Sequence, residues 1–206
     1  MPAVKFFRPF SEIILGIWHI TENEEKLIHL LSESGNEGTI RPVAHAGQRL
    51  RHIAGRALLA SVSSYIYGSN PHPIIIFETG LPGLAGHGGN VSISHCEGFA
   101  TCAIAMNPAI TTGTDIEIPS IKMLSLAPRF LNHTEIEQAA GNMETTAKFW
   151  CGKEALYKAL APGNAGMLPG ESMGIRRRFA ETGSWDIFTD TYMNAVLAVA
   201  RNRTNC

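Results

Sequence analysis

The sequence predicts an α+β fold made of two similar halves that meet near residue 110. The predicted segments follow the order strand, helices and strands, and then helices and strands again. Hydrophobic residues make up 45% of the chain and charged residues 17%, which is typical of a globular protein. A length of 206 residues suffices for one large domain or two small ones with an apolar core. The expected halves are residues 1–109 and 110–206, although no internal repeat is visible in the sequence.

The first half is expected to begin with a strand, followed by two helices and several short strands. The capping-box pattern of Thr21 and Glu24 predicts the start of the first helix. Apolar residues at three- and four-residue spacing predict the second helix, which ends at Gly68. Residues 34–39 and the glycine-rich 80–90 are expected to be loops. The predicted elements are a strand at 12–20, helices at 22–33 and 43–67, and strands at 74–77, 91–95 and 99–106.

The second half is expected to begin with a strand that carries the sequence GTDIEIP, residues 113–119. Three helices should follow, and a final sheet should close the fold. The predicted helices are 121–131, 134–140 and 144–160, and the predicted strands are 173–179, 184–190 and 194–200.

Charge and cysteine content exclude several classes of protein. The chain has 17 Lys and Arg against 18 Asp and Glu and a net charge of −1. It therefore lacks the excess of basic residues that a protein needs to bind a nucleic acid. Four cysteines form no C-x-x-C pair, which argues against a disulfide framework or a zinc site. The apolar run at 13–18 is too short for an export signal or a membrane span. We therefore expect a cytoplasmic protein with neither a membrane nor a nucleic-acid partner.

Two acidic residues are expected on one face of the strand at 113–119. Asp115 and Glu117 are two residues apart, and alternate strand residues point to the same face. Adjacent carboxylates raise each other's pKa unless a positive charge lies between them. The pair is therefore either an exposed strand end or part of a cation site.

The helix predicted over 144–160 carries a second set of charged residues. Glu154 and Lys158 are one turn apart on the same face, and Trp150 lies one turn earlier. Alone, this pattern also fits a surface ion pair beside a half-buried tryptophan. Together with Asp115 and Glu117, Glu154 completes a set of three carboxylates, which suits Mg²⁺ bound beside a phosphate.

These motifs resemble the paired signature of the 4′-phosphopantetheinyl transferases. The sequence G-T-D-I-E at 113–117 is followed by W-x-x-K-E-x-x-x-K at 150–158, with the order and spacing of the single-chain, surfactin-synthetase-activating type. Two weaker motifs, AGRALL at 54–59 and SISHC at 92–96, lie in the expected order. The resemblance covers roughly residues 45–160.

The resemblance implies both a fold and a reaction. Two similar α/β halves would form one chain, with the active site in the cleft between them. The enzyme would be a holo-[acyl-carrier-protein] synthase that transfers the phosphopantetheine arm of coenzyme A to a serine of an apo acyl- or peptidyl-carrier protein. It would require Mg²⁺ or Mn²⁺ and would release adenosine 3′,5′-bisphosphate. Because a duplicated chain builds its interface internally, a monomer is expected.

The resemblance also implies roles for the residues of the metal and transfer site. Asp115, Glu117 and Glu154 would be the metal ligands. Glu154, or a metal-bound water that it orients, would take the proton of the serine. Lys158 would lie against the leaving phosphate, and Lys153 would either reach another phosphate or support the site from behind.

Further residues would hold the phosphates of coenzyme A. Arg56 and His95 match the motifs that do so in the family, and Arg49 is a further candidate two turns before Arg56, whereas Arg51 lies off that face. The family commonly has Gly-Lys-Pro before the histidine motif, and here Leu81 replaces the lysine. Coenzyme A would then bind more weakly, or an arginine such as Arg49 would substitute.

Two other functions remain open at this point. A metal-dependent nuclease or phosphodiesterase also uses clustered acids and a lysine, although the charge balance argues against it. A carrier-binding homologue without activity is the other alternative, since Leu81 departs from the family pattern. Between the two signature motifs lie apolar residues that would line either the core or a carrier-docking surface. These are Met123, Leu124, Phe130 and Leu131.

Overall fold

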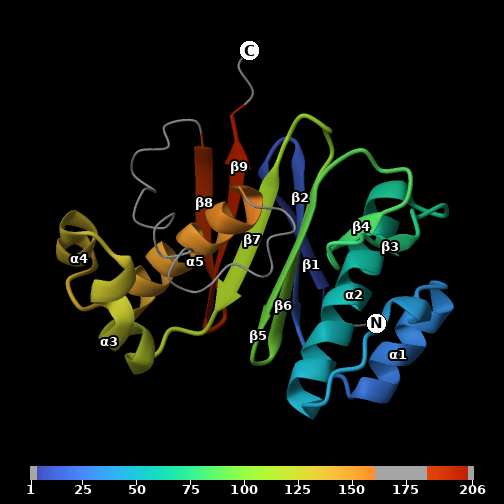
Figure 1. The fold of residues 1–206 in the computed structure, drawn as a ribbon, viewed down its shortest axis with the longest axis horizontal. Helices are drawn as coiled ribbons and strands as arrows, with labels where there is room; N and C mark the ends of the chain where they lie inside the picture. The colour runs from blue at the N-terminus through green and yellow to red at the C-terminus, as the bar shows by residue number, and fades with distance from the viewer. Residues whose placement is uncertain (1–3, 161–184, 204–206) are drawn as a thin grey trace.

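The computed structural model describes residues 4–160 and 185–203. Figure 1 shows strands stacked in the centre, with helices on both sides. The helices are α1 (Glu24–Glu33), α2 (Ala46–Tyr67), α3 (Ile121–Phe130), α4 (His133–Ala139) and α5 (Met143–Leu160), with a short 3-10 turn at Glu37–Thr39. The strands are β1 (Val4–Phe10), β2 (Ile13–His19), β3 (Ile74–Ile76), β4 (Pro82–Leu84), β5 (Val91–Cys96), β6 (Phe99–Ala105), β7 (Thr112–Glu117), β8 (Trp185–Tyr192) and β9 (Ala195–Asn202).

The strands form two main antiparallel sheets and one small hairpin. The first sheet has the order β1-β2-β6-β5, the second has the order β7-β9-β8, and β3 pairs with β4. Helix α2 packs on the first sheet and α5 on the second. Strands β5 and β7 lie beside each other at the junction, where Ser92 Oγ accepts the backbone N–H of Thr114 at 3.0 Å. The mixed architecture confirms the predicted α+β class.

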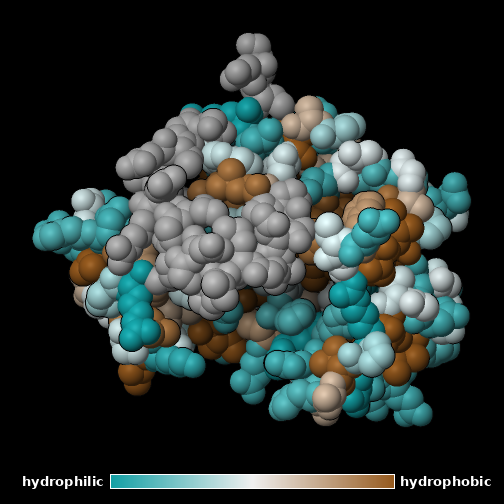
Figure 2. All heavy atoms as spheres, viewed as in Figure 1, coloured by the Kyte–Doolittle hydropathy of each residue, from teal (hydrophilic) through white to brown (hydrophobic). Residues whose placement is uncertain are grey.

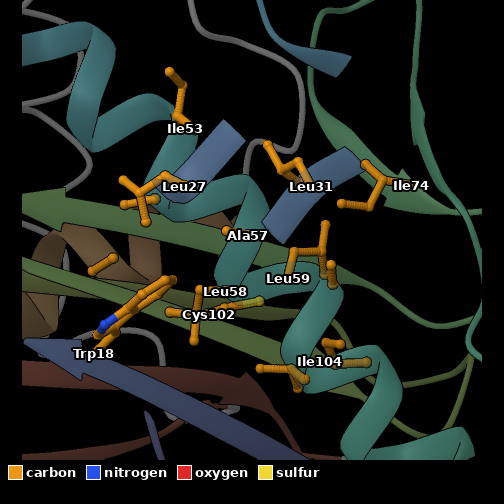
Figure 3. Packing of buried hydrophobic residues seen from close by; sticks show 14 of the residues in the cluster. Trp18, Leu27, Leu31, Ile53, Ala57, Leu58, Leu59, Ile74, Cys102 and Ile104 are labelled. Carbon is orange, nitrogen blue, oxygen red and sulfur yellow. The ribbon is translucent and has the colours of Figure 1, made fainter. Parts of the chain in front are cut away.

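Strand β2 is buried on both faces, which explains its uninterrupted apolar sequence. Ile14 and Trp18 face the core beneath α1 and α2, which Figure 3 shows with Leu27, Leu58 and Ile104. The alternate residues of β2 pack against the second sheet instead. These alternate residues are Ile13, Leu15 and Ile17, and their partners include Ile116, Leu197 and Val199.

Two glycines allow a helix to lie close to a strand. A Cβ at Gly16 of β2 would lie 2.5 Å from Val62 Cγ2 of α2. A Cβ at Gly113 of β7 would lie 2.0 Å from the carbonyl oxygen of Ala155 in α5. The second contact is with backbone, so no side-chain rotation relieves it. Each sheet therefore holds its main helix at a glycine.

Most predicted elements agree with the structure to within a few residues, but the expected loop at 80–90 contains strand β4 and one strand was missed. The predicted strand at 173–179 lies outside the described residues. The predicted cap of α1 was wrong, because Asn23, not Thr21, accepts the backbone N–H of Lys26 at 3.0 Å and α1 begins at Glu24. Strand β1 was missed because its Lys5, Arg8 and Pro9 are unusual in a strand. Proline is tolerated there because β1 is an edge strand with an irregular register between Phe7 and Phe10.

Figure 2 shows mostly hydrophilic residues over the outer end of the molecule, where α4 lies. None of the helices in 4–160 is both long and apolar enough to cross a membrane. Cys96, Cys102 and Cys151 are buried free thiols.

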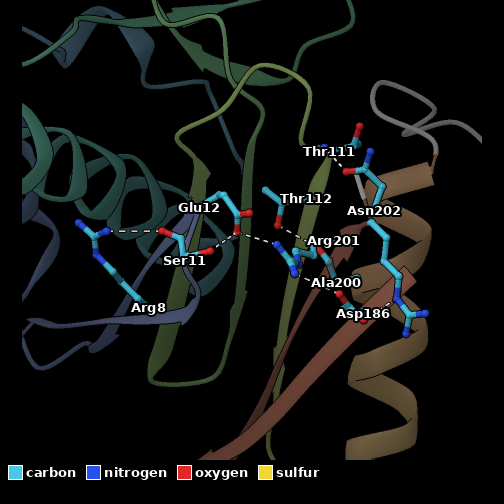
Figure 4. A network of polar contacts seen from close by, with 10 residues as sticks. Arg8, Ser11, Glu12, Thr111, Thr112, Asp186, Ala200, Arg201 and Asn202 are labelled. Atoms are coloured by element: carbon cyan, nitrogen blue, oxygen red, sulfur yellow. Dashed lines mark hydrogen bonds and ion pairs between the residues drawn. The ribbon is translucent and has the colours of Figure 1, made fainter. Parts of the chain in front are cut away.

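Arg201 joins the first sheet to the second at the end of β9 (Figure 4). Its Nη1 donates to Glu12 Oε2 at 2.6 Å, and its Nη2 donates to Asp186 Oδ2 at 3.2 Å. Its guanidinium also lies 4.6 Å from the ring centroid of Phe10. Arg203 binds the other oxygen of Asp186 at 2.8 Å but is much more exposed.

We expect Arg201→Met to lower the free energy of unfolding by about 1–2 kcal/mol, because two charge-assisted contacts across the sheets are lost from a partly exposed site. The matched control is Arg203→Met, which removes an exposed contact with the same Asp186 and should cost less than about 0.5 kcal/mol. Urea unfolding of the three proteins measures both values. Equal losses for the two variants would contradict a special role for Arg201.

Candidate functional site

Three elements bring charged and polar side chains together where β5, β7 and α5 meet. Lys158 Nζ of α5 donates to Asp115 Oδ1 of β7 at 2.7 Å and to Ser94 Oγ of β5 at 2.8 Å. It also donates to the carbonyl of Thr114 at 3.1 Å. Ser94 Oγ in turn donates to Asp115 Oδ1 at 2.7 Å. The structure therefore places Lys158 on Asp115, two residues that the sequence assigned to one site from distant segments.

The second oxygen of Asp115 is buried and has no hydrogen-bond partner among the described residues. Asp115 is only 4% exposed, and its Oδ2 accepts no hydrogen bond from the part of the chain that the structure describes. Leaving a buried carboxylate oxygen unsatisfied is unfavourable, so such an atom needs an explanation. A cation bound at this oxygen would supply one.

Glu117 lies two residues after Asp115 on the same face of β7, close to the negative charges of Asp115 and Glu154. Burial, and next the negative charge of Asp115, raise the pKa of Glu117 to about 7. Glu154 raises it further, whereas Lys158 and Arg51 lower it. Asp115 and Glu154 therefore both act on Glu117, while the shared metal site stays a prediction.

The donor set fits a hard divalent cation in its chemistry. Asp115, Glu117 and Glu154 offer only carboxylate oxygens, and one of these oxygens is buried and unsatisfied. Within 4–160 and 185–203, no three His, Cys, Asp or Glu side chains are gathered as closely as in a formed metal centre. The assignment of these three residues as metal ligands therefore stays a prediction.

A groove of about 570 Å³ opens beside Glu117. Its lining includes Arg51 and His52 of α2, His95 at the end of β5, and Glu117. Glu117 thus belongs both to the acidic group and to the wall of the groove. Gly55 lets α2 approach β5 closely here, since a Cβ at this position would lie 3.0 Å from Ile93 Cγ2.

Behind the groove lies a buried arginine. Arg56 is 6% exposed, and burial, followed by the neighbouring charge of Arg41, lowers its pKa to about 10. Burial and the charge of Arg56 lower the pKa of His52 to about 4, so that His52 is neutral at physiological pH. Arg56 Nε and His52 Nε2 are buried without a partner among the described residues. Such a cluster favours an anion, because a bound anion would offset the cost of the buried positive charge.

Arg49 and Arg51 do not lie as the sequence argument expected. Arg49 Nε donates to Glu24 Oε1 at 2.8 Å and its Nη1 to the carbonyl of Val43 at 3.1 Å, so Arg49 ties α2 to α1. Arg51, which was set aside, lines the groove. The signal that could have identified Arg51 is Gly55, because a residue one turn earlier on the helix shares the face that approaches β5.

Lys153 lies away from the groove. It is 1% exposed, and its Nζ donates to Glu135 Oε2 at 2.6 Å and to the carbonyl of Phe130 at 2.9 Å. Of the two roles that the sequence left open, this placement favours support from behind over contact with a phosphate.

The loop with Leu81 has an arginine beside it. Arg41 Nη2 donates to the carbonyl of Gly80 at 2.7 Å. Leu81 itself lines a separate pocket of about 380 Å³, together with Phe77, His87 and other residues. The sequence named Arg49 as the substitute for the absent lysine, whereas the structure places Arg41 at this loop.

Comparison with known proteins points to one superfamily. Residues 111–201 match the model of the 4′-phosphopantetheinyl transferase superfamily. The matched segment runs from the start of β7 into β9 and includes Asp115, Glu117, Glu154 and Lys158. The match supports this superfamily over the part of the chain that carries the candidate site. A search among curated proteins gave no match.

Proposed function

We propose that the protein transfers 4′-phosphopantetheine from coenzyme A to a serine of an apo acyl- or peptidyl-carrier protein. It would be a holo-[acyl-carrier-protein] synthase of the surfactin-synthetase-activating type. One observation carries the proposal: the acidic group formed by Asp115, Glu117 and Glu154 opens, through Glu117, into a groove lined by Arg51, His52 and His95. A site with both features suits a substrate that carries a diphosphate and a further phosphate.

The groove wall formed by α2 and the end of β5 would bind the phosphates of coenzyme A. Arg51 lines the groove and Arg56 adds a second positive charge. His52 and His95 would act as neutral hydrogen-bond donors, because burial lowers the pKa of both. A guanidinium and a phosphate form paired, charge-assisted hydrogen bonds, which makes arginine well suited to this role. We expect Arg49 to contribute less than the sequence suggested, because its side chain is engaged with Glu24.

Asp115, Glu117 and Glu154 would hold Mg²⁺ or Mn²⁺, which when bound neutralises diphosphate charge. Two further steps, removal of the serine proton and stabilisation of the leaving phosphate, would be carried out by side chains. Glu154 would accept the proton of the carrier serine as the serine oxygen attacks phosphorus. Lys158 would place its ammonium against the phosphate that leaves with adenosine 3′,5′-bisphosphate.

The proposal includes the arrangement of the two halves. The first sheet with α2 and the second sheet with α5 would be two similar α/β halves, divided near residue 110, with the active site in the cleft between them. The location of Lys158, Asp115 and Ser94 at the junction of β5, β7 and α5 supports this arrangement. We propose a cytoplasmic monomer, in keeping with the composition.

The decisive experiment is incubation of the protein with coenzyme A, Mg²⁺ and several apo-carriers from fatty-acid, polyketide and nonribosomal-peptide systems. Mass spectrometry should show a gain of one phosphopantetheine on at least one carrier. Nucleic-acid or phosphodiester cleavage without that gain would favour the nuclease. Carrier binding without that gain would identify an inactive homologue.

We expect Arg41→Met to weaken coenzyme A binding about tenfold, because it removes a charge that lies close to Arg56 and Gly80. Leu81→Lys should tighten binding in the wild type and recover the loss in the Arg41→Met background. Isothermal titration with coenzyme A measures all four proteins. Unchanged affinity in both proteins with Lys at 81 would show that this loop does not face the cofactor.

A further inference from the structure

Lys153 and Glu135 form a buried ion pair that the proposed transfer step does not use. Their Nζ and Oε2 atoms are 2.6 Å apart, and their side chains are 1% and 8% exposed. Lys153 directly precedes Glu154, and successive helix residues point about 100° apart. Glu154 therefore belongs to the acidic group, while Lys153 is directed toward α3 and α4.

The pair fixes the turn between α3 and α4. Lys153 Nζ also donates to the carbonyl of Phe130, the last residue of α3, where helix carbonyls lack an intrahelical partner. Glu135 closes a capping box at the start of α4, in which Asn132 N donates to Glu135 Oε2 at 2.8 Å. The ring of Phe130 packs edge-on against Trp150 of α5 at 4.8 Å. One lysine thus joins the end of α3 and the start of α4 to α5.

Net stability does not explain a pair of this kind. Two buried charges lose their hydration, so a well-packed apolar pair of similar volume is often as stable. Removing one partner alone, however, leaves an uncompensated buried charge. The value of the pair therefore lies in the position that it gives to α3 and α4 on α5.

The position of α3 on α5 affects how a partner protein can approach Glu117 and Glu154. Helix α3 follows Glu117 after three residues, and its first residue, Ile121, is 78% exposed. The charged residues of α3 are Lys122 and Arg129, both basic and both exposed. Figure 1 shows α3 and α4 at the outer end of α5, on the side away from the first sheet. The first turn of α3 is therefore close in the chain to Glu117, and its exposed isoleucine and basic residues would suit a protein surface with acidic and apolar residues.

We propose that Lys153 and Glu135 are positioning residues that set recognition of the carrier protein without contacting coenzyme A. This inference rests on the proposed function, because it assigns the acceptor side of the same site. By holding the turn at Asn132, the pair fixes the direction in which α3 presents Ile121 and its two basic residues.

The test compares Lys153→Met, Glu135→Gln and the double variant Lys153→Met/Glu135→Met with the wild type. We expect each single variant to raise KM for the apo-carrier about tenfold and to leave KM for coenzyme A unchanged, since a misplaced helix affects the partner that touches it. The double variant should show the same rise in KM for the carrier as the single variants, because each change breaks the same interaction, although it leaves no uncompensated buried charge. Lys148→Met is the control, since it breaks the exposed Lys148–Glu144 pair on the same helix.

Several results would overturn the inference. A higher KM for coenzyme A in Lys153→Met but not in Glu135→Gln would make Lys153 a phosphate ligand. Lower melting temperatures with both KM values unchanged would make the pair merely structural. If Lys153→Met does not fold, Glu135→Gln and the double variant decide the question. Absence of transfer by the wild type would instead refute the proposed function, so the two failures are distinguishable.

Discussion

Glu154→Ala is expected to lower the rate of phosphopantetheine transfer by about 10²–10⁴-fold, because positioned proton transfer contributes an effect of this size. Asp115→Ala should likewise nearly abolish transfer, since Asp115 binds Lys158 and, in the proposed function, would hold the metal with its second oxygen. Glu154 is only partly buried, so its truncation should leave the fold intact. Single-turnover assays with a modified carrier, together with thermal unfolding, measure both properties.

The control for this prediction is Glu144→Ala, which removes an exposed carboxylate from the first turn of the same helix. It should transfer at the wild-type rate. Near-normal turnover by either Glu154→Ala or Asp115→Ala would refute the roles assigned to these acids.

Gly113→Ala is expected to lower the free energy of unfolding by about 3 kcal/mol. The added Cβ would lie 2.0 Å from the carbonyl oxygen of Ala155 and 2.7 Å from the backbone nitrogen of Ala159, so α5 must move off β7. For a chain of this length the melting temperature should fall by roughly 6–12 °C. Lys158 belongs to α5, so a shift of this helix would move Lys158 away from Asp115. Transfer should therefore also be lost at temperatures where the variant is still folded.

Gly38→Ala is the matched control, because a Cβ at this position meets nothing within 4 Å. Its effect should stay within about 0.5 kcal/mol. Calorimetry on both variants tests the prediction. A Gly113→Ala protein as stable and active as the control would show that the approach of α5 to β7 is not required.

The sequence predicted the elements that depend on local patterns. The long periodic helix α2 and the alternating strand β5 agree with expectation, because their apolar spacing reflects one buried face. Strand β6 was also predicted, from an apolar run that is buried on both faces. The start of α1 was misplaced because Thr21 and Asn23 both suit a cap, and only the chain path into the first sheet selects Asn23. Strand β1 depends on pairing with β2, which local sequence does not reveal.

In the candidate site, too, some residues follow from local spacing and others depend on how distant segments pack. Asp115, Glu117, Glu154 and Lys158 could be named from spacing, since each pair lies on one strand face or one helix face. The contributions of Arg41, Arg51 and Ser94 depend on how α2, β5 and the loop at Gly80 are packed, and no short-range spacing encodes that. Lys153 differs from Glu154 by one helix position, so only the placement of α4 reveals that it is buried.

The double-sided burial of β2 has a consequence for how the molecule unfolds. Its Ile14 and Trp18 belong to the core under α2, while Ile13, Leu15 and Ile17 share a core with Ile116 and Leu197 from beyond residue 110. A fragment cut at that residue would expose an entire sheet face to water. The chain should therefore denature cooperatively, and exchange of one half for that of a relative would require repacking of the shared layer.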